Sequence, residues 1–253
     1  MSTNVQSLLL DKKKVLTSGV AFGNELLTDL LSTPDLATCL RPELIVVPLT
    51  VNQVLYELGD QIDYVYFPLD SVVSDLSITE DGTTIETSMV GREGVVGVSM
   101  LLGSGCSRQW IGVTISGNAI QLNAKLLDRL LIDNATALKS FLRYYRALMI
   151  QLSQRCVCNT RHTILERLCC WLLMIHDRVG QINLSLTQEM IASRVGARRA
   201  GITVAAGLLQ EMNAIVSRRG RVHIENREAL TRIVCECYNN MQADFTPIAP
   251  PSV

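Results

Sequence analysis

Two pairs of arginines are the residues of this chain whose type and spacing most clearly suggest chemistry. Arg198 and Arg199 come just after a glycine, and Arg218 and Arg219 come just before one. A guanidinium group can donate two parallel hydrogen bonds to guanine O6 and N7, or to the oxygens of a phosphate. The first pair is therefore a candidate for contacts with base edges, and the second a candidate for contacts with phosphates.

The first arginine pair lies in a segment with the pattern of a helix-turn-helix. Residues 186–195 and 197–212 both space their apolar side chains with a helical period, and Gly196 stands between them at a turn position. Thr187 is placed to cap the first helix. Taken alone, the two helices fit equally well to an αα corner with solvated arginines.

A basic hairpin and a segregated charge favour DNA binding. The β-prone runs 214–216 and 222–224 flank the second arginine pair, as in a wing. Residues 160–234 hold 11 arginines, no lysine and 6 acidic residues, a formal net charge of +5, whereas the whole chain carries −1. The rest of the chain therefore carries −6, and the positive charge is confined to the segment with the arginine pairs.

Residues 44–122 show short strands separated by tight turns. Asp81-Gly82 separates the strand-like runs 72–79 and 83–90, which is a hairpin signal. In the second run, one set of side chains points to one face and Glu86 and Ser88 point to the other. Frequent glycines between short strands predict a compact antiparallel barrel or sandwich.

A long helix with an apolar seam is expected after the strands. No proline interrupts residues 69–246, so helices can run unbroken there. Positions spaced alternately by four and three form an a/d seam, which consists of Leu138, Leu142, Tyr145, Met149, Leu152 and Cys156. The seam fits either a helix packed on its own barrel or a coiled-coil dimer, and its length favours the dimer.

Taken together, these features resemble the Crp/Fnr family of bacterial transcription regulators over residues 40–238. The motifs that carry the resemblance are Tyr64-Val65-Tyr66-Phe67-Pro68, Gly91-Arg92-Glu93-Gly94-Val95-Val96-Gly97, Leu186-Thr187-Gln188-Glu189, Val195-Gly196, Arg198-Arg199 and Cys235-Glu236-Cys237-Tyr238. The resemblance implies an α+β fold with an N-terminal antiparallel β-roll like that of cyclic-nucleotide-binding domains. A long dimerisation helix and a C-terminal winged helix-turn-helix follow. We expect these parts at 21–134, 135–159 and 160–238, with a tail at 239–253.

The resemblance also implies a set of DNA-binding residues. Arg199 matches a position where the family contacts guanine, and Thr187 and Gln188 match positions that contact phosphate. The predicted DNA-binding set is Thr187, Gln188, Arg198, Arg199, Thr203, Arg218 and Arg219. Ala200 stands where many family members have an acidic residue that contacts a base, so the half-site is expected to differ from the usual one.

In the sensor, the residues at the family's effector-binding positions are Gly97, Val98 and Arg108. Val98 stands where cyclic-nucleotide-binding members have a glutamate for the ribose hydroxyl, and its side chain cannot accept a hydrogen bond. Gln109 and Trp110 replace the small residues that accompany the arginine. We therefore expect no binding of cyclic AMP by the usual chemistry, and leave open another ligand, a partner or no ligand.

The cysteines and histidines predict no metal and no cofactor. Only Cys39 precedes residue 100, so the ligands of the N-terminal iron–sulfur cluster of oxygen-sensing members are missing. Three close pairs do not form CxxC units and support zinc only weakly, namely Cys156 with Cys158, Cys169 with Cys170, and Cys235 with Cys237. Burial as small apolar residues is favoured for Cys156 and Cys169. Thiol redox sensing at Cys106 or Cys158 stays open, and the histidines His162, His176 and His223 lie outside the β-roll, which excludes haem ligation by His there.

Enzymes and membrane proteins are disfavoured. No serine stands with a histidine and an aspartate in a nucleophile motif, and Gly91–Gly97 lacks the Lys-Ser/Thr of a P-loop. The apolar runs are far shorter than the roughly 20 residues of a membrane helix. In Met1–Lys14 the basic residues follow the leucines, the reverse of a secretory signal.

We therefore expect a cytoplasmic bacterial homodimer that binds double-stranded DNA at a palindromic site and does not enter a membrane. RNA polymerase is a candidate further partner, and the small-molecule effector is unknown. The alternative is a ligand- or partner-sensing β-roll protein whose winged helix makes protein contacts.

Overall fold

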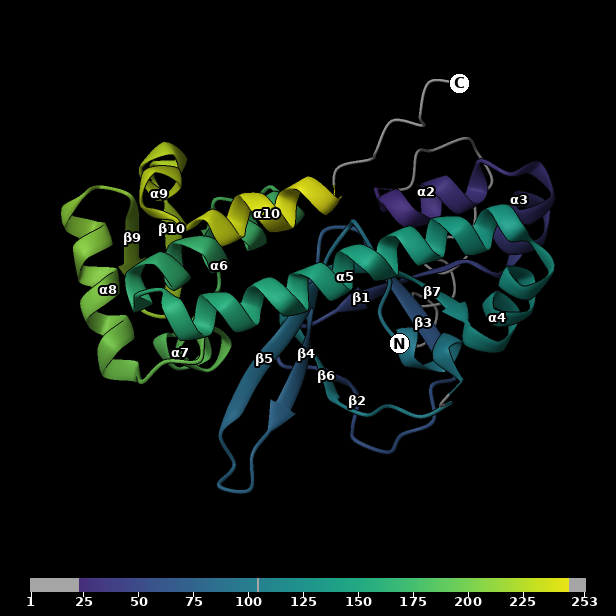
Figure 1. Cartoon of the computed structure of the whole chain (residues 1–253), viewed down its shortest axis with the longest axis horizontal. Helices are drawn as coiled ribbons and strands as arrows, with labels where there is room; N and C mark the ends of the chain where they lie inside the picture. Colours follow the sequence, from purple (N-terminus) through teal and green to yellow (C-terminus); the bar gives the residue numbers. More distant parts are fainter. Residues whose placement is uncertain (1–22, 104, 246–253) are drawn as a thin grey trace, which may run out of the picture. The chain divides into compact units, whose positions relative to one another are not determined.

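The structure, a computed structural model, describes residues 23–103 and 105–245 (Figure 1). The described residues form two compact units. The first unit consists of the residues up to Val73 together with Val90–Arg143, and the second of Ser74–Met89 together with the residues from Tyr144 onward. The order of elements is that of the predicted α+β fold, with strands first and a helix-rich C-terminal part.

Two antiparallel sheets form the β-roll. The first has the order β1-β7-β3 and consists of β1 (Ile45–Leu49), β7 (Gly117–Asn123) and β3 (Tyr64–Pro68). The second has the order β2-β6-β4-β5 and consists of β2 (Val54–Tyr56), β6 (Trp110–Ile115), β4 (Val72–Ile78) and β5 (Thr84–Val90), with β4 passing from the first unit into the second.

The core of the first unit lies on one face of its strands. Val65 pairs with Leu122 and Phe67 with Ile120, and all four side chains are buried. Because side chains alternate along a strand, the two pairs place one continuous apolar face on β3 and β7.

Short helices surround the roll within the first unit. They are α2 (Glu25–Leu31), α3 (Pro34–Leu40), η1 (Arg41–Glu43), η2 (Val98–Leu102) and α4 (Ala124–Asp133). Asn24 caps α2 by accepting a hydrogen bond from the Leu27 N–H, and its side-chain amide donates to the carbonyls of Pro68 and Gly94 at 2.9 and 2.8 Å. This buried asparagine therefore fixes the start of α2 on the roll.

Helix α5 (Ala135–Arg161) carries the predicted seam. Four seam residues are exposed within this chain, Leu138, Leu142 (51%), Met149 (44%) and Cys156, so the predicted burial of Cys156 is wrong. A different set of side chains on the helix is buried, among them Phe141 and Tyr144. The interpretation in which the seam packs on its own barrel is therefore wrong for these four residues, because the helix buries another face.

The second unit contains the predicted helix-turn-helix and wing. After α5 come α6 (Ile164–Val179), β8 (Asn183–Leu184), α7 (Gln188–Val195), α8 (Arg199–Glu211), β9 (Ile215–Arg218), β10 (Arg221–Ile224), α9 (Arg227–Ile233) and α10 (Glu236–Phe245). The three strands form a sheet in the order β8-β10-β9. Helix α6 is the core element, because its residues from Leu168 to Ile175 are all buried. Figure 1 shows α7 and α8 beside it.

The prediction of a tail over residues 239–253 is wrong for residues 239–245. Residues 239–245 belong to α10, in which Cys237, Tyr238 and Met241 are buried. The nearby prolines suggested a tail, but the apolar side chains at the start of the helix pack into the unit and keep it helical. Residues 246–253 lie outside the described residues.

Among the described residues, no helix has both the length and the hydropathy to cross a membrane.

Candidate nucleic-acid interface

The turn between α7 and α8 is closed by local hydrogen bonds that the sequence encodes. Thr187 caps α7, because its hydroxyl accepts the Met190 N–H at 3.1 Å. Gly196 ends α7 with a φ of 68°, a left-handed conformation that favours glycine. The Arg167 guanidinium on α6 donates to the carbonyls of Val195 and Gly196, the latter at 2.9 Å. The turn between α7 and α8 is thus held by the conformation of Gly196 and by the hydrogen bonds from Arg167.

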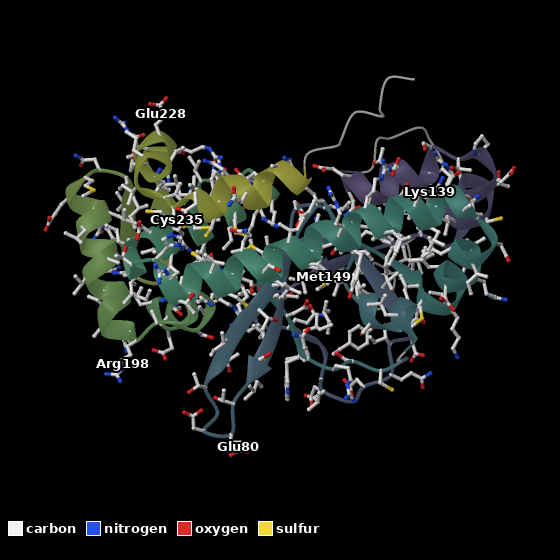
Figure 2. The ribbon with its side chains drawn as sticks, in the orientation of Figure 1. Glu80, Lys139, Met149, Arg198, Glu228 and Cys235 are labelled. Atoms are coloured by element: carbon white, nitrogen blue, oxygen red, sulfur yellow. The ribbon has the colours of Figure 1, made fainter. Side chains whose placement is uncertain are left out.

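A glycine sets α8 close to α6. A Cβ atom at Gly201 would lie 2.6 Å from Cδ1 of Ile164, which is too close for a carbon–carbon contact. Ile202 is fully buried in the same turn, while Arg198 and Arg199 are exposed at the start of the helix. Figure 2 shows the side chain of Arg198 extending away from the ribbon. The packing of α8 therefore leaves its N-terminal arginines free to contact a ligand.

The wing is a two-residue hairpin with a basic tip. Arg218 and Arg221 pair across the strands, and Arg219 and Gly220 between them have φ values of 46° and 75°. Two successive residues with positive φ are the requirement of a type I′ turn, whose twist matches that of the flanking strands. Arg218, Arg219 and Arg221 are all exposed.

A groove brings the start of α7, the start of α8 and the wing together. Its lining consists of Leu186, Thr187, Gln188, Glu189, Arg199, Ser217, Arg219 and Gly220. The Thr203 hydroxyl donates to Gln188 Oε1 at 2.9 Å, which joins α8 to α7 at the edge of this lining. Of the predicted DNA-binding set, Thr187, Gln188, Arg199 and Arg219 line the groove and Thr203 contacts it, whereas Arg198 and Arg218 are exposed outside the lining.

The groove offers donors of two kinds. Its lining includes the guanidinium groups of Arg199 from α8 and Arg219 from the wing, together with the Thr187 hydroxyl and the Gln188 amide at the start of α7. Arginines of this kind can bind phosphates or pair with guanine, and an amide at a helix start can reach the backbone of a duplex. The arrangement suits a polyanion with exposed base edges.

The predicted effector residues lie apart from this groove in the chain. Gly97, with a φ of 95°, precedes the short helix η2, and Val98 is its first residue. Arg108 is exposed ahead of β6. Among the hydrogen bonds and ion pairs found for the described residues, none joins Arg108 to Gly97 or Val98.

A buried ionic network joins β5 to α5 and to α7, the first helix of the helix-turn-helix. Glu86 on β5 is buried, and its carboxylate contacts Arg155 of α5 at 3.3 Å and Arg194 of α7 at 3.8 Å. It also accepts hydrogen bonds from the Ser74 hydroxyl at 2.6 Å and the Trp171 indole at 2.9 Å. A buried carboxylate needs such partners, since an unpaired buried charge is strongly destabilising.

The ionic network corrects what the sequence predicted for Glu86 in the hairpin. Glu86 was predicted only as a hairpin residue, yet the face that it shares with Ser88 is buried. Strand alternation separates the two faces but does not tell which of them is covered. Arg155 Nη2 also donates to the carbonyls of Glu86 and Arg194, at 3.0 and 2.8 Å, so Arg155 joins β5 to the end of α7.

Asp75 is a second carboxyl group on the hairpin whose pKa is shifted. Asp75 accepts a hydrogen bond from the Ser88 hydroxyl at 2.5 Å. Burial raises the pKa of Asp75 to about 6, against the effect of that hydrogen bond.

One group of side chains could hold a metal ion, although the sequence predicted none. It consists of Cys158, His162, Cys235 and Cys237, whose ligand atoms all lie within 4.8 Å of one another. The sequence signal was present only as two separate pieces, Cys-x₃-His and Cys-x-Cys, far apart in the chain.

Comparison with known proteins gives a consistent result. Residues 166–233 match the Crp-like helix-turn-helix domain. FixK2 from Bradyrhizobium japonicum has a similar structure, with 14% sequence identity, a TM-score of 0.65, and coverage of 76% of this chain and 98% of that chain.

Two further solved structures are comparably similar. A putative transcriptional regulator of the Crp/Fnr family from Eubacterium rectale has 15% identity, a TM-score of 0.64, and coverage of 83% of this chain and 98% of that one. TTHB099, a transcriptional regulator of the CRP family from Thermus thermophilus, has 17% identity, a TM-score of 0.61, and coverage of 74% and 95%. No curated protein matches the chain in sequence.

Proposed function

We propose that this chain, which carries a Crp-like helix-turn-helix domain and has the fold of the Crp/Fnr regulators, is a transcription regulator that binds double-stranded DNA. It acts as a cytoplasmic DNA-binding protein rather than an enzyme. The observation that carries the proposal is the groove, where Arg199 of the helix-turn-helix and Arg219 of the wing line one surface with Thr187 and Gln188.

Each part of the groove has a distinct role in this proposal. Arg199, and Arg198 beside it, enter the major groove and contact base edges, because they project from the N-terminal end of α8. Thr187 and Gln188 bind a phosphate at the start of α7, and Arg218 and Arg219 bind phosphates from the wing. The hydrogen bond from Thr203 to Gln188 holds the amide in place.

The protein binds as a homodimer on a palindromic site. The exposed seam on α5 supports this, because large apolar side chains at a and d spacing are left uncovered by their own chain. A second copy of α5 would cover them and place two α8 helices about one helical turn of DNA apart.

The β-roll serves as a sensor that does not use the usual cyclic AMP chemistry. The departures from the cyclic-nucleotide pattern at Val98, Gln109 and Trp110 support this. The β-roll responds to another ligand or to a partner, or has no ligand at all, and RNA polymerase is a candidate further partner of the regulator. We therefore assign residues 21–134 to sensing, 135–159 to dimerisation, and 160–238 to DNA binding.

The proposal is tested by selecting duplexes from a random library with the full-length protein at low salt. We expect enrichment of an inverted repeat. Arg199→Ala should weaken binding to the selected duplex by about 1–3 kcal/mol and relax base preference at one position of each half-site. Arg232→Ala on α9 removes the same charge from an exposed site outside the groove lining and should change binding little.

The alternative is that the winged helix mediates protein contacts. That reading is supported instead if no duplex is enriched at low salt, or if Arg199→Ala and Arg232→Ala weaken binding equally.

A further inference from the structure

Three thiols and one imidazole converge where the end of α5 meets the start of α10. Cys158 lies in the last turn of α5, and His162 directly follows that helix, where its N–H donates to the Cys158 carbonyl at 3.2 Å, so both side chains project to the same side. Cys235 and Cys237 flank the first residue of α10. Figure 2 labels Cys235 at this end of α10, inside the second unit. We propose that these four side chains form a structural zinc site, which does not depend on the proposed DNA binding.

The spacing of the ligand atoms fits a tetrahedral metal. With Zn–S near 2.3 Å and Zn–N near 2.0 Å, tetrahedral angles place two sulfurs about 3.8 Å apart and a sulfur and a nitrogen about 3.6 Å apart. Cys158 Sγ and Cys235 Sγ are separated by 3.6 Å, and Cys237 Sγ and His162 Nδ1 also by 3.6 Å. Two of the six ligand pairs therefore already have the spacing of a tetrahedral site, and all pairs lie within 4.8 Å of one another.

The histidine is oriented for ligation through Nδ1. Its other nitrogen, Nε2, lies 3.3 Å from the carboxylate of Glu236. A metal-bound imidazole commonly donates its remaining N–H to a carboxylate, which fixes the ring and its tautomer. Glu236 lies between the two cysteine ligands in sequence, so the turn into α10 supplies two ligands and the group that orients a third.

The surroundings favour a structural site over a catalytic one. Cys158, Cys235 and Cys237 are buried, and the side chain of His162 is only 12% exposed. Four protein ligands complete a tetrahedron and leave no position for water or substrate. Three sulfurs and one imidazole nitrogen form a soft ligand set that selects zinc over magnesium or calcium.

A disulfide is the competing use of the same thiols. All eight cysteines are free in this structure. A bond between Cys158 and Cys235 would engage two of the four groups and give no role to Cys237, His162 or the carboxylate that orients it. Zinc uses all four, and its binding releases the thiol protons without any oxidant.

The site would tie together elements that are distant in sequence. Cys158 and Cys235 are 77 residues apart, and the ion would join the end of α5 to the last described helix. Zinc at this place would hold α10 on the unit and stabilise it, since metal bound only by the folded state adds to its stability.

The test uses the full chain purified under reducing conditions and dialysed against metal-free buffer. Metal content is measured by inductively coupled plasma mass spectrometry. The metal-free chain is then titrated with Co²⁺, whose absorption spectrum reports tetrahedral thiolate ligation. We expect one zinc per chain, and a Co²⁺ complex with sulfur-to-metal charge-transfer bands that zinc displaces. Removing zinc should lower the melting temperature.

Variants assign the ligands. Cys158→Ser and Cys237→Ser should each lose stoichiometric zinc, whereas Cys169→Ser, which removes a buried thiol outside the group, should retain it. His162→Cys keeps four ligands, so it should retain the metal and shift the Co²⁺ spectrum towards that of a four-thiolate site, even if other variants fail to fold.

Three outcomes would overturn the proposal. They are a reduced wild-type chain that binds neither zinc nor Co²⁺ above background, equal zinc content in Cys158→Ser and Cys169→Ser, or stoichiometric iron or copper in place of zinc. A chain that binds neither zinc nor Co²⁺ but still binds its DNA site would refute the zinc site and leave the proposed function standing.

Discussion

We expect the stability of the second unit to depend more on the charge of the buried Glu86 carboxylate than on any other single charge. Glu86→Gln preserves size and most hydrogen bonds but removes the negative charge between Arg155 and Arg194. Both arginine side chains are only about a tenth exposed, at 10% and 9%, and the carboxylate is not exposed at all. Removing one partner of a buried ion pair costs about 3–5 kcal/mol, because the remaining charges stay buried without compensation.

We take the lower end of that range, since the amide oxygen can still accept from the Trp171 indole while the amide NH2 donates to the Ser74 hydroxyl. A loss of about 3 kcal/mol corresponds to a fall in melting temperature of roughly 6–12 °C for a protein of this size. Trp171 donates directly to Glu86, so its fluorescence in a Trp110→Phe background should report unfolding of this unit by urea.

A matched control lies on the same hairpin. Glu80, labelled in Figure 2, is exposed near the hairpin tip, and Glu80→Gln makes the same chemical change without burial. It should alter the free energy of unfolding by less than about 0.5 kcal/mol. If Glu86→Gln unfolds at the same urea concentration as Glu80→Gln, the reasoning about the network is refuted.

Three further predictions concern the seam, the helix packing and the hairpin. Met149→Glu places a charge in the α5 seam and should convert a dimer into a monomer by light scattering, whereas Lys139→Glu, which is off the seam, should not. Gly201→Ala should destabilise by no more than about 1 kcal/mol, because the new methyl group meets only the flexible end of Ile164 and alanine favours the helix, and Ile164→Val should remove the loss in a double-mutant cycle. Burial raises the pKa of Asp75 from its ordinary value of 3.8 to about 6, so folding favours its protonated form and its contribution to stability is lost as the pH rises from about 4 to about 6. Asp75→Asn should lack that decline in urea midpoints measured across this range, and an identical decline in the variant would contradict the assignment.

Local signals in the sequence were sufficient for the helix-turn-helix. Thr187 and Gly196 each act on the backbone within a few residues, so their positions predicted the cap of α7 and the turn before α8. The wing could be predicted in the same way, because β-prone runs around a basic turn indicate a hairpin without reference to the rest of the chain.

Features that depend on distant segments could not be predicted in this way. The burial of Glu86 depends on Arg155, Arg194 and Trp171, which come from three separate helices. The candidate metal ligands come together only when Cys158 contacts Cys235, which lies 77 residues further along the chain. Neither pattern exists until the chain folds, and the spacing rules for metal sites detect ligands that are near each other in sequence.

In our proposal, the groove formed by α7, α8 and the wing binds a DNA duplex through its arginines. The salt dependence of affinity for the selected duplex is the decisive measurement. We expect log K to fall linearly with log salt concentration, with a slope of about −0.9 per phosphate contact, and Arg219→Ala to make the slope shallower by about 1 per chain. An affinity that does not change with salt, or a slope unchanged by Arg219→Ala, would contradict it.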